Sequence, residues 1–238
     1  MVNDGGHIIM RKLCLGILLL ISTASMGQII PGVVASSIQH ISLYVGLRAH
    51  WSLEETSGTT VYDATSNNFD GTTNATINQT GKSGQCETFA RASSQYINFG
   101  ATVGDVGTSD FSISAWIYTS TNNVTQGIKG NFGDGAYPYF YLTIYSDNLA
   151  RGVINLTGTN LTVGSNTTIP TGQWVSLIVT ADRDGLMKIY VNGAEQTTTV
   201  NISSGSTVNI ANSNTYNVGN IGNAFTGYYF DGKIDEPE

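Results

Sequence analysis

Residues 50–71 read HWSLEETSGTTVYDATSNNFDG, and the rest of the chain can be interpreted from this segment. It begins like a buried strand, continues through an acidic turn and ends in a loop rich in Asp, Asn and Gly. Near the other end of the chain, residues 230–236 read FDGKIDE. We expect these two segments to meet in space and to close a β-sandwich made of two sheets.

The clearest strand pattern lies at residues 111–118, FSISAWIY. Phe111, Ile113, Ala115 and Ile117 recur at every second position, so they share one face of a strand. Ser112, Ser114, Trp116 and Tyr118 fall on the other face. This alternation predicts a strand that is buried on one side.

Three further strands form a predicted meander over residues 173–200. QWVSLIVTA at 173–181 leads through Asp184-Gly185 into LMKIYV at 186–191, and Asn192-Gly193 repeats the hairpin signal one strand later. Turn clusters recur along the chain at the spacing of a sandwich or jelly roll, and no window shows a convincing helical period. The predicted fold class is therefore all-β, a two-sheet antiparallel jelly roll. Additional β-rich runs occupy residues 95–99 and 137–145.

The composition excludes several classes of function. The net charge is -7 and no cluster of Lys or Arg occurs, which argues against nucleic acid as a partner. His7, His40 and His50 are the three histidines, so no histidine follows Trp51. The absence of histidine from Trp51 onward removes Ser-His-Asp and Cys-His catalysis and most zinc sites.

The N-terminal residues have the pattern of a secretory signal peptide. Residues 10–12, MRK, are positively charged, residues 13–21 are apolar, and small residues follow. We expect a signal peptide over 1–27, with Met10 as an alternative start, and a secreted or cell-surface protein; a single membrane anchor is the alternative. Residues 28–46 are expected to form a linker or N-terminal arm, and residues 47–238 the domain. Removal of Cys14 would leave Cys86 as a lone cysteine, expected to be a small core residue.

Four segments in this order resemble the concanavalin A-like lectin/glucanase superfamily, in particular its laminin G-like and pentraxin-like branch. They are residues 51–71, FSISAWIY at 111–118, TGQWVSLIVTADRDGLMKIYVNG at 171–193, and YFDGKIDE at 229–236. The resemblance implies a jelly-roll sandwich that serves as a binding or adhesion module. Members of the family normally continue past the last segment into another strand, whereas this sequence stops at Pro237-Glu238. We therefore expect either a fragment or an incomplete last strand with an open sheet edge.

The loop at 63–71 is the best candidate for a metal site, because calcium prefers six to eight oxygen ligands, about 2.3–2.6 Å away. The resemblance implies a structural calcium held by Asp63, by carbonyls around Asn68 and Gly71, and by Asp235. The alternative is an Asn- and Asp-rich turn whose side chains cap their own backbone.

Exposed aromatic rings beside amides and carboxylates are the candidates for binding sugar, because rings stack on pyranoses while Asn and Asp bind hydroxyls. The richest stretch is 131–141, NFGDGAYPYFY, with Asn131, Asp134, Tyr137, Tyr139 and Tyr141 as predicted ligand-binding residues. In the alternative interpretation, the tyrosine face of this strand belongs to the core.

The predicted function is a non-catalytic carbohydrate-binding or adhesion module, whose partner is a glycan or cell-surface polysaccharide, or a protein. Hydrolases of the superfamily carry E-x-D-x-x-E, which sets two carboxylates about 5–5.5 Å apart for retaining chemistry. No glutamate of this chain has an aspartate two positions later, so we expect no enzyme. Two alternatives stay open: a structural protein-interaction module of a larger surface or virion-like assembly, and an accessory domain of a longer glycoside hydrolase.

Overall fold

The computed structural model describes residues 46–133, 137–222 and 227–238. The predicted signal peptide, Cys14 and nearly all of the predicted linker lie outside the described residues. In the part of the chain that is described, no helix has the length and apolar character needed to cross a membrane.

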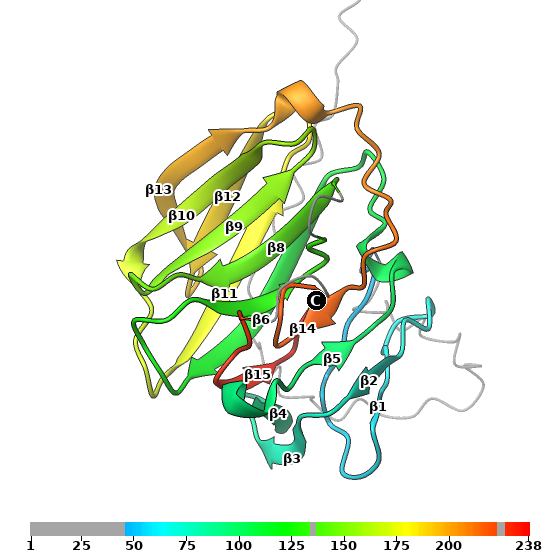
Figure 1. Ribbon diagram of the computed structural model, residues 1–238, viewed down its shortest axis with the longest axis vertical. Coiled ribbons are helices and arrows are strands. Elements are labelled where there is room, and N and C mark those ends of the chain that lie inside the picture. The colour runs from blue at the N-terminus through cyan, green and yellow to red at the C-terminus, as the bar shows by residue number, and fades with distance from the viewer. Residues whose placement is uncertain (1–45, 134–136, 223–226) are drawn as a thin grey trace, which may run out of the picture. The chain divides into compact units, whose positions relative to one another are not determined.

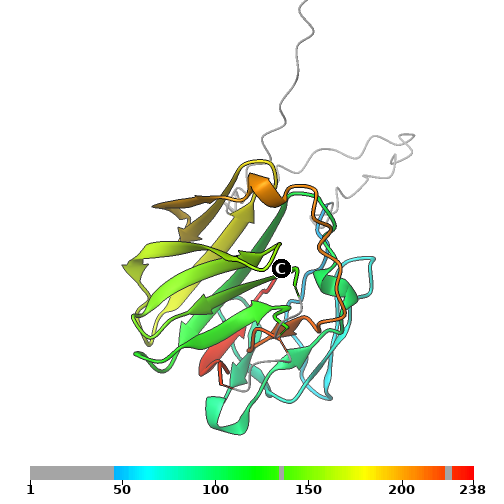
Figure 2. The same ribbon diagram turned by 45° about the horizontal axis from the view of Figure 1, so that its top comes forward.

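Two antiparallel sheets form two layers (Figures 1 and 2). The eight-stranded sheet has the order β1 (Thr60–Val61), β2 (Gly71–Thr73), β5 (Ile97–Asn98), β14 (Asn217–Val218), β7 (Gln126–Gly130), β8 (Tyr139–Ile144), β9 (Leu149–Asn155) and β10 (Asn160–Thr168). The seven-stranded sheet has the order β13 (Ala194–Asn201), β12 (Leu186–Val191), β11 (Trp174–Ala181), β6 (Phe111–Thr119), β15 (Gly232–Asp235), β4 (Gln85–Phe89) and β3 (Thr76–Thr80). Short 3₁₀ turns occupy Arg91–Ser93, Thr102–Gly104 and Ser203–Gly205. The predicted jelly-roll sandwich is confirmed.

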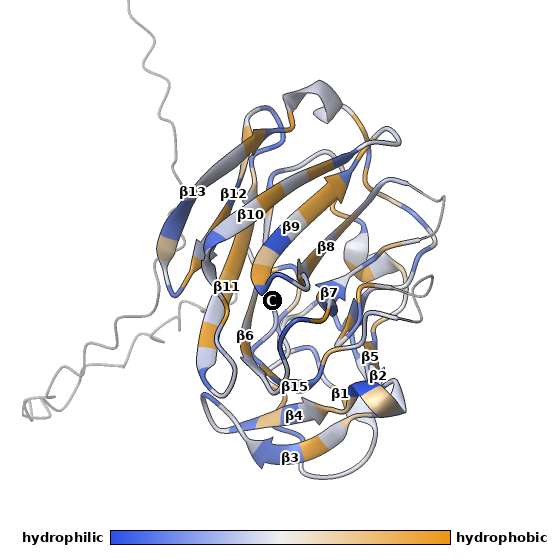
Figure 3. Cartoon of the chain, turned by 60° about the vertical axis from the view of Figure 1, so that its left-hand side comes forward, coloured by the Kyte–Doolittle hydropathy of each residue, from blue (hydrophilic) through white to orange (hydrophobic). Residues whose placement is uncertain are grey.

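The core lies between the two sheets and follows the predicted alternation. Ile117 on β6 and Leu142 on β8 are both fully buried in one cluster that takes side chains from both sheets. Hydrophobic and polar bands alternate along the strands (Figure 3). A Cβ added at Gly152 on β9 would lie 2.7 Å from Val179 Cγ2 on β11, so glycine lets the sheets approach at this point. Glycine ordinarily weakens the interior of a strand, and the close approach of the two sheets explains its presence at position 152.

The predicted meander is present with nearly the predicted bounds. Strand β11 pairs with both β6 and β12, and β12 pairs in turn with β13, all antiparallel. The two predicted hairpin dipeptides fall in the turns between these strands, where Asn192 and Gly193 both adopt positive φ. Cys86 is fully buried, as expected of a core cysteine.

The two segments that were expected to close the sandwich do meet. The backbone N–H of Trp51 donates to the Pro237 carbonyl at 3.2 Å. His50 Nε2 lies 3.1 Å from Glu236 Oε2, and His50 Nδ1 lies 3.2 Å from Glu238 Oε1. Hydrogen bonds to Glu236 and then Glu238 outweigh burial and raise the pKa of His50 to about 9. The expected open edge is not found at β15, because this strand pairs with β4 on one side and β6 on the other.

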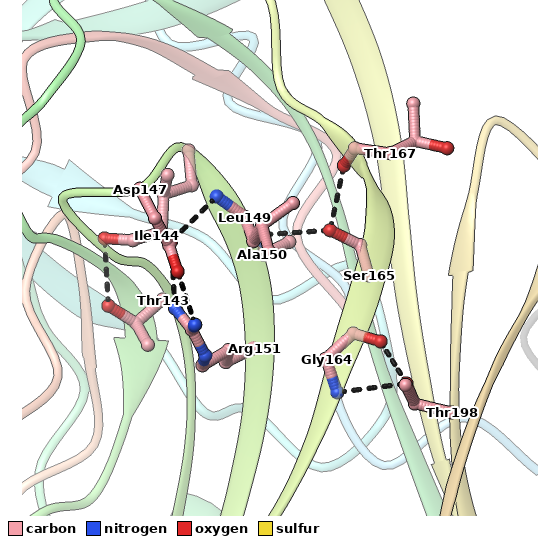
Figure 4. A network of polar contacts seen from close by, with 10 residues as sticks. All are labelled: Thr143, Ile144, Asp147, Leu149, Ala150, Arg151, Gly164, Ser165, Thr167 and Thr198. Carbon is pink, nitrogen blue, oxygen red and sulfur yellow. Dashed lines mark hydrogen bonds and ion pairs between the residues drawn. The ribbon is translucent and has the colours of Figure 1, made fainter.

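Side chains seal the edge where β10 of one sheet meets β13 of the other (Figure 4). The Gly164 N–H donates to Thr198 Oγ1 at 3.2 Å, and the Thr198 hydroxyl donates back to the Gly164 carbonyl. On the neighbouring strand β9, Arg151 forms an ion pair with Asp147, which lies in the β8–β9 turn. The two Gly164–Thr198 bonds satisfy backbone groups that an uncovered edge strand would expose.

A buried carboxyl joins the two sheets near β2. The Thr73 hydroxyl on β2 donates to Glu87 Oε2 on β4 at 2.6 Å, and Glu87 is fully buried. Burial raises the pKa of Glu87 to about 7; the Thr73 bond opposes this shift and the charge of Glu55 adds to it. Glu87 Oε1 and Glu55 Oε2 are buried and accept no hydrogen bond from the described residues. The ionised form of Glu87 is therefore costly in the folded protein.

Candidate binding groove on the eight-stranded sheet

The loop that carries the predicted metal ligands is organised by the Asp63 carboxylate. Its Oδ1 accepts from the backbone N–H groups of His50 and Thr65, at 3.1 and 2.9 Å. Its Oδ2 accepts from the Thr65 hydroxyl at 2.7 Å and from Phe69 N at 3.0 Å. Burial disfavours the charged form, but the bonds from Thr65, Phe69 and His50 together hold the pKa of Asp63 below its ordinary value. Asn68 sits at a positive φ of 55°, a turn conformation that asparagine tolerates.

These contacts occupy the Asp63 carboxylate, which was expected to bind the cation. A carboxylate has about four lone-pair sites, and all four at Asp63 are taken by donors of its own loop. Asp235 lies elsewhere, on β15, where its Oδ2 accepts from Lys82 N at 2.7 Å and Ser83 N at 3.0 Å. Across the described ranges, no three His, Cys, Asp or Glu side chains gather into a group that could hold a metal ion. As they lie, Asp63 and Asp235 face backbone donors, which favours the self-capped loop; the calcium site at Asp63, Asn68, Gly71 and Asp235 stays a prediction.

The predicted sugar-binding stretch forms a second small core on the outer face of the eight-stranded sheet. Tyr139 and Tyr141 are 6% and 7% exposed and pack with Phe132 and Ile221. Asn131 is fully buried and accepts from Phe140 N at 2.8 Å. None of these three predicted residues offers an exposed ring or amide, which is the outcome expected if the tyrosine face were core.

The other two predicted residues of this stretch have different outcomes. Tyr137 is 53% exposed, so its ring remains available for stacking. Asp134 lies outside the described residues.

One row of residues crosses the outer face of this sheet and connects the tyrosine core to a polar region. The strand registers place its members directly opposite one another, in the order Thr72, Asn98, Asn217, Gly130, Tyr141, Val153 and Thr162. Beyond Asn217 the row becomes accessible, because Asn98 is half-buried and Thr72 exposed. The face is therefore closed over β8 and β9 and open over β2 and β5.

An open groove of about 520 Å³ lies on the open part of the face. We refer to it as the β2–β5 groove, because these strands form its floor. It has the volume of a typical small-molecule site. Its lining combines one carboxylate, two amides, two threonines, an aromatic ring at Tyr96 and a buried Phe99: Asp70, Thr72, Thr73, Asn74, Tyr96, Asn98, Phe99 and Gly100.

Three polar side chains of the groove, those of Asp70, Asn74 and Asn98, are each held by one hydrogen bond through Oδ1 and keep a second polar atom. Asp70 Oδ1 accepts from Asp63 N at 2.8 Å, Asn74 Oδ1 from Tyr96 N at 2.8 Å, and Asn98 Oδ1 from Gly100 N at 2.8 Å. Because the oxygens face backbone N–H groups, the orientations of the amides are fixed. The two Nδ2 donors have no acceptor among the described residues. The groove thus presents pre-oriented donors of the kind that bind hydroxyl groups.

The floor of the groove rests on the segment that closes the sandwich. Phe99 stacks on Trp51, with ring centroids 3.9 Å apart, and Trp51 Nε1 donates to the Phe69 carbonyl at 2.8 Å. The side chain of Tyr96 packs 6.2 Å from Tyr229. The two segments that close the sandwich therefore also support the groove, through the Trp51–Phe99 and Tyr229–Tyr96 ring contacts.

The sequence interpretation did not select Asn74, Tyr96 or Asn98. Strands β2 and β5 are three and two residues long, too short for a clear alternation. The sequence carried one weak signal for these residues. In TTN at 72–74 and YIN at 96–98, the first and third residues are polar or aromatic, so they share one face of a short strand.

The profile of the concanavalin A-like lectin/glucanases superfamily matches residues 91–238. The chain belongs to this superfamily. The matched residues run from the first 3₁₀ turn through β15, and the match confirms the resemblance found in the sequence. A search of curated proteins finds no match.

Solved structures with the same superfamily fold are distant in sequence. Domain 4 of AbnA, a GH43 extracellular arabinanase from Geobacillus stearothermophilus, in complex with arabinotriose, has a TM-score of 0.55 and 22% identity, over 80% of this chain and 89% of that one. The binding domain of Paraclostridial Mosquitocidal Protein 1 has a TM-score of 0.62 and 13% identity, over 79% and 47%. The binding domain of botulinum neurotoxin DC, in complex with rat synaptotagmin II, has a TM-score of 0.60 and 13% identity, over 79% and 46%. The chain spans about half of the toxin binding domains, and these likenesses show the fold alone.

Proposed function

We propose that this laminin G-like domain is a secreted, non-catalytic carbohydrate-binding module whose ligand lies in the β2–β5 groove. The observation that carries the proposal is the pair of oriented amide donors, Asn74 and Asn98, beside the Tyr96 ring and the Asp70 carboxylate. Oriented amides match hydroxyl groups, and an aromatic face matches the apolar side of a sugar ring. The neighbour of similar fold in complex with arabinotriose supports a sugar as the class of ligand.

The composition of the groove supports binding without hydrolysis. Glycoside hydrolysis of the common kind needs two carboxyl groups that flank the scissile bond. Asp70 is the one carboxylate in the lining, and no histidine accompanies it. Glu87 and Asp235, two acids whose pKa burial raises, are fully buried and do not line the groove.

The proposal is tested by affinity electrophoresis in gels that contain neutral polysaccharides, with arabinan, xylan and laminarin as probes. We expect at least one of them to retard the protein, and Asn98→Ala to reduce the retardation about tenfold or more, because it removes the Nδ2 donor. Thr162→Ala is the matched control, on the same sheet face but outside the groove. Retardation that persists in Asn98→Ala would move the site away from the groove.

A protein partner is the second candidate, in line with the notion of a structural interaction module. A toxin binding domain of which this chain covers 46% is in complex with rat synaptotagmin II, which supports a protein as the alternative class of partner. Absence of retardation in every polysaccharide gel would favour this alternative.

A further inference from the structure

The outer face of the seven-stranded sheet carries an aromatic group that the proposed groove does not use. Trp116 and Tyr118 alternate with the core residue Ile117 on β6, so they point away from the core. Trp174 on β11 lies directly opposite Tyr118, with ring centroids 5.7 Å apart. All three aromatic side chains are half-buried. An outward sheet face is ordinarily polar, so a cluster of three large rings there indicates a surface with a binding role.

Two lysines flank these rings. Lys82 Nζ lies 4.7 Å from the centroid of the Trp116 ring. Lys233 on β15 lies opposite Tyr118 in the β15–β6 ladder, and its Nζ donates to the Thr80 carbonyl at 3.1 Å. We call Lys82, Trp116, Tyr118, Trp174 and Lys233 the aromatic–lysine face.

Neither lysine of this face forms an ion pair with a carboxylate of the described residues. The contrast is Lys188 on β12, whose Nζ lies 3.0 Å from Glu195 Oε1. Asp235 lies opposite Trp116, but it is fully buried and its Oδ2 faces backbone N–H groups of the 82–83 turn. In a chain with a net charge of -7, the face therefore presents two lysine ammonium groups beside half-buried rings.

We propose that the aromatic–lysine face binds a chain of uronic acid residues, at a site separate from the β2–β5 groove. The apolar faces of the pyranose rings contact Trp174 and Tyr118, and the carboxylates contact Lys82 and Lys233. A neutral sugar would leave both ammonium groups without a carboxylate partner, and two lysines are too few for the phosphate backbone of a nucleic acid. In a uronic acid, the carboxylate is attached directly to the ring carbon, so it stays beside a stacked ring, where these lysines lie. The complementarity of charge selects this ligand over a neutral glycan.

The test is affinity electrophoresis of the whole protein in gels that contain polygalacturonate, at low and at physiological salt. We expect retardation that weakens as salt rises, because exposed charge pairs are screened. The double variant Lys82→Gln/Lys233→Gln keeps most of each aliphatic stem and should bind about tenfold more weakly. Trp174→Ala should also reduce binding, whereas Asn98→Ala in the groove should not change it.

Lys188→Gln is the matched control, because it removes a lysine of the same sheet that already has a carboxylate partner. It should bind polygalacturonate as the wild type does. Failure to bind polygalacturonate at low salt, or an equal loss in Lys188→Gln and in the double variant, would overturn the proposal. Equal retardation by dextran sulfate would also overturn it, because the face would then respond to charge alone. Failure in the neutral gels leaves this test unaffected, because the two sites are on different sheets.

Discussion

Glu87→Gln is expected to change the pH dependence of stability, because this carboxyl is buried where only its neutral form is well accommodated. Its pKa rises from 4.5 to about 7 on folding, a difference of about 2.5 units. At about 1.4 kcal/mol per unit, the folded state loses about 3 kcal/mol of stability as pH rises from below 4.5 to above 7. The sign follows from proton uptake: between these values the folded protein keeps a proton that the unfolded chain has released. Glutamine cannot ionise, and its amide oxygen can still accept the Thr73 hydroxyl.

The assay is urea unfolding of the wild type and Glu87→Gln at pH 5 and pH 8. Relative to the wild type, the variant should gain about 2–3 kcal/mol of unfolding free energy between the two pH values. Taking the difference between the two proteins cancels the other titrating groups, such as Asp235. Glu195→Gln is the control, because Lys188 lowers the pKa of the exposed Glu195, so this carboxyl has no raised pKa to add to the change between the two pH values. A variant-minus-wild-type difference that is the same at both pH values would refute the reasoning.

Three further predictions concern the end segments and the loop of Asp63. His50→Gln should destabilise the protein by about 1–2 kcal/mol at pH 6, a figure reduced because solvent screens Glu236 and Glu238. The loss should become smaller as pH rises through 9, where the folded protein releases the His50 proton, and urea unfolding at pH 6 and pH 10 checks this. Asp63→Ala should cost about 2–4 kcal/mol, because it removes four hydrogen bonds to one carboxylate, and a loss under 1 kcal/mol in urea unfolding would contradict the self-capped loop. Chelator should leave the thermal midpoint of the wild type unchanged, whereas a rise on adding calcium would restore the predicted metal site.

The long strands were predictable because each has one buried and one outward face. The alternation in 111–118 located β6 within one residue of its observed end, and the glycine hairpins delimited β12 at both ends. The meeting of residues 50–71 with 230–236 was also expected from the sequence, and His50 Nε2 lies 3.1 Å from Glu236 Oε2. The core between the sheets followed from these patterns.

The site was less predictable, because alternation shows which face a residue shares but not what covers that face. Tyr139 and Tyr141 were correctly placed on one side of β8, yet Phe132 and Ile221 pack over them. Asp63 resembles a metal ligand in the sequence. Only the positions of its four donors show that its carboxylate accepts hydrogen bonds from His50, Thr65 and Phe69. Lys129 likewise has a role that the sequence does not show: it is fully buried, and its Nζ donates to the Ser114 carbonyl at 3.0 Å.

The measurement that tests the central proposal most directly is a glycan array probed with the wild type and with Asn98→Ala side by side. The β2–β5 groove predicts binding of at least one neutral glycan by the wild type, with loss of that signal in the variant and retention in Thr162→Ala. Silence of the wild type on every glycan, or an undiminished signal from Asn98→Ala, would contradict the assignment of the groove as the carbohydrate site.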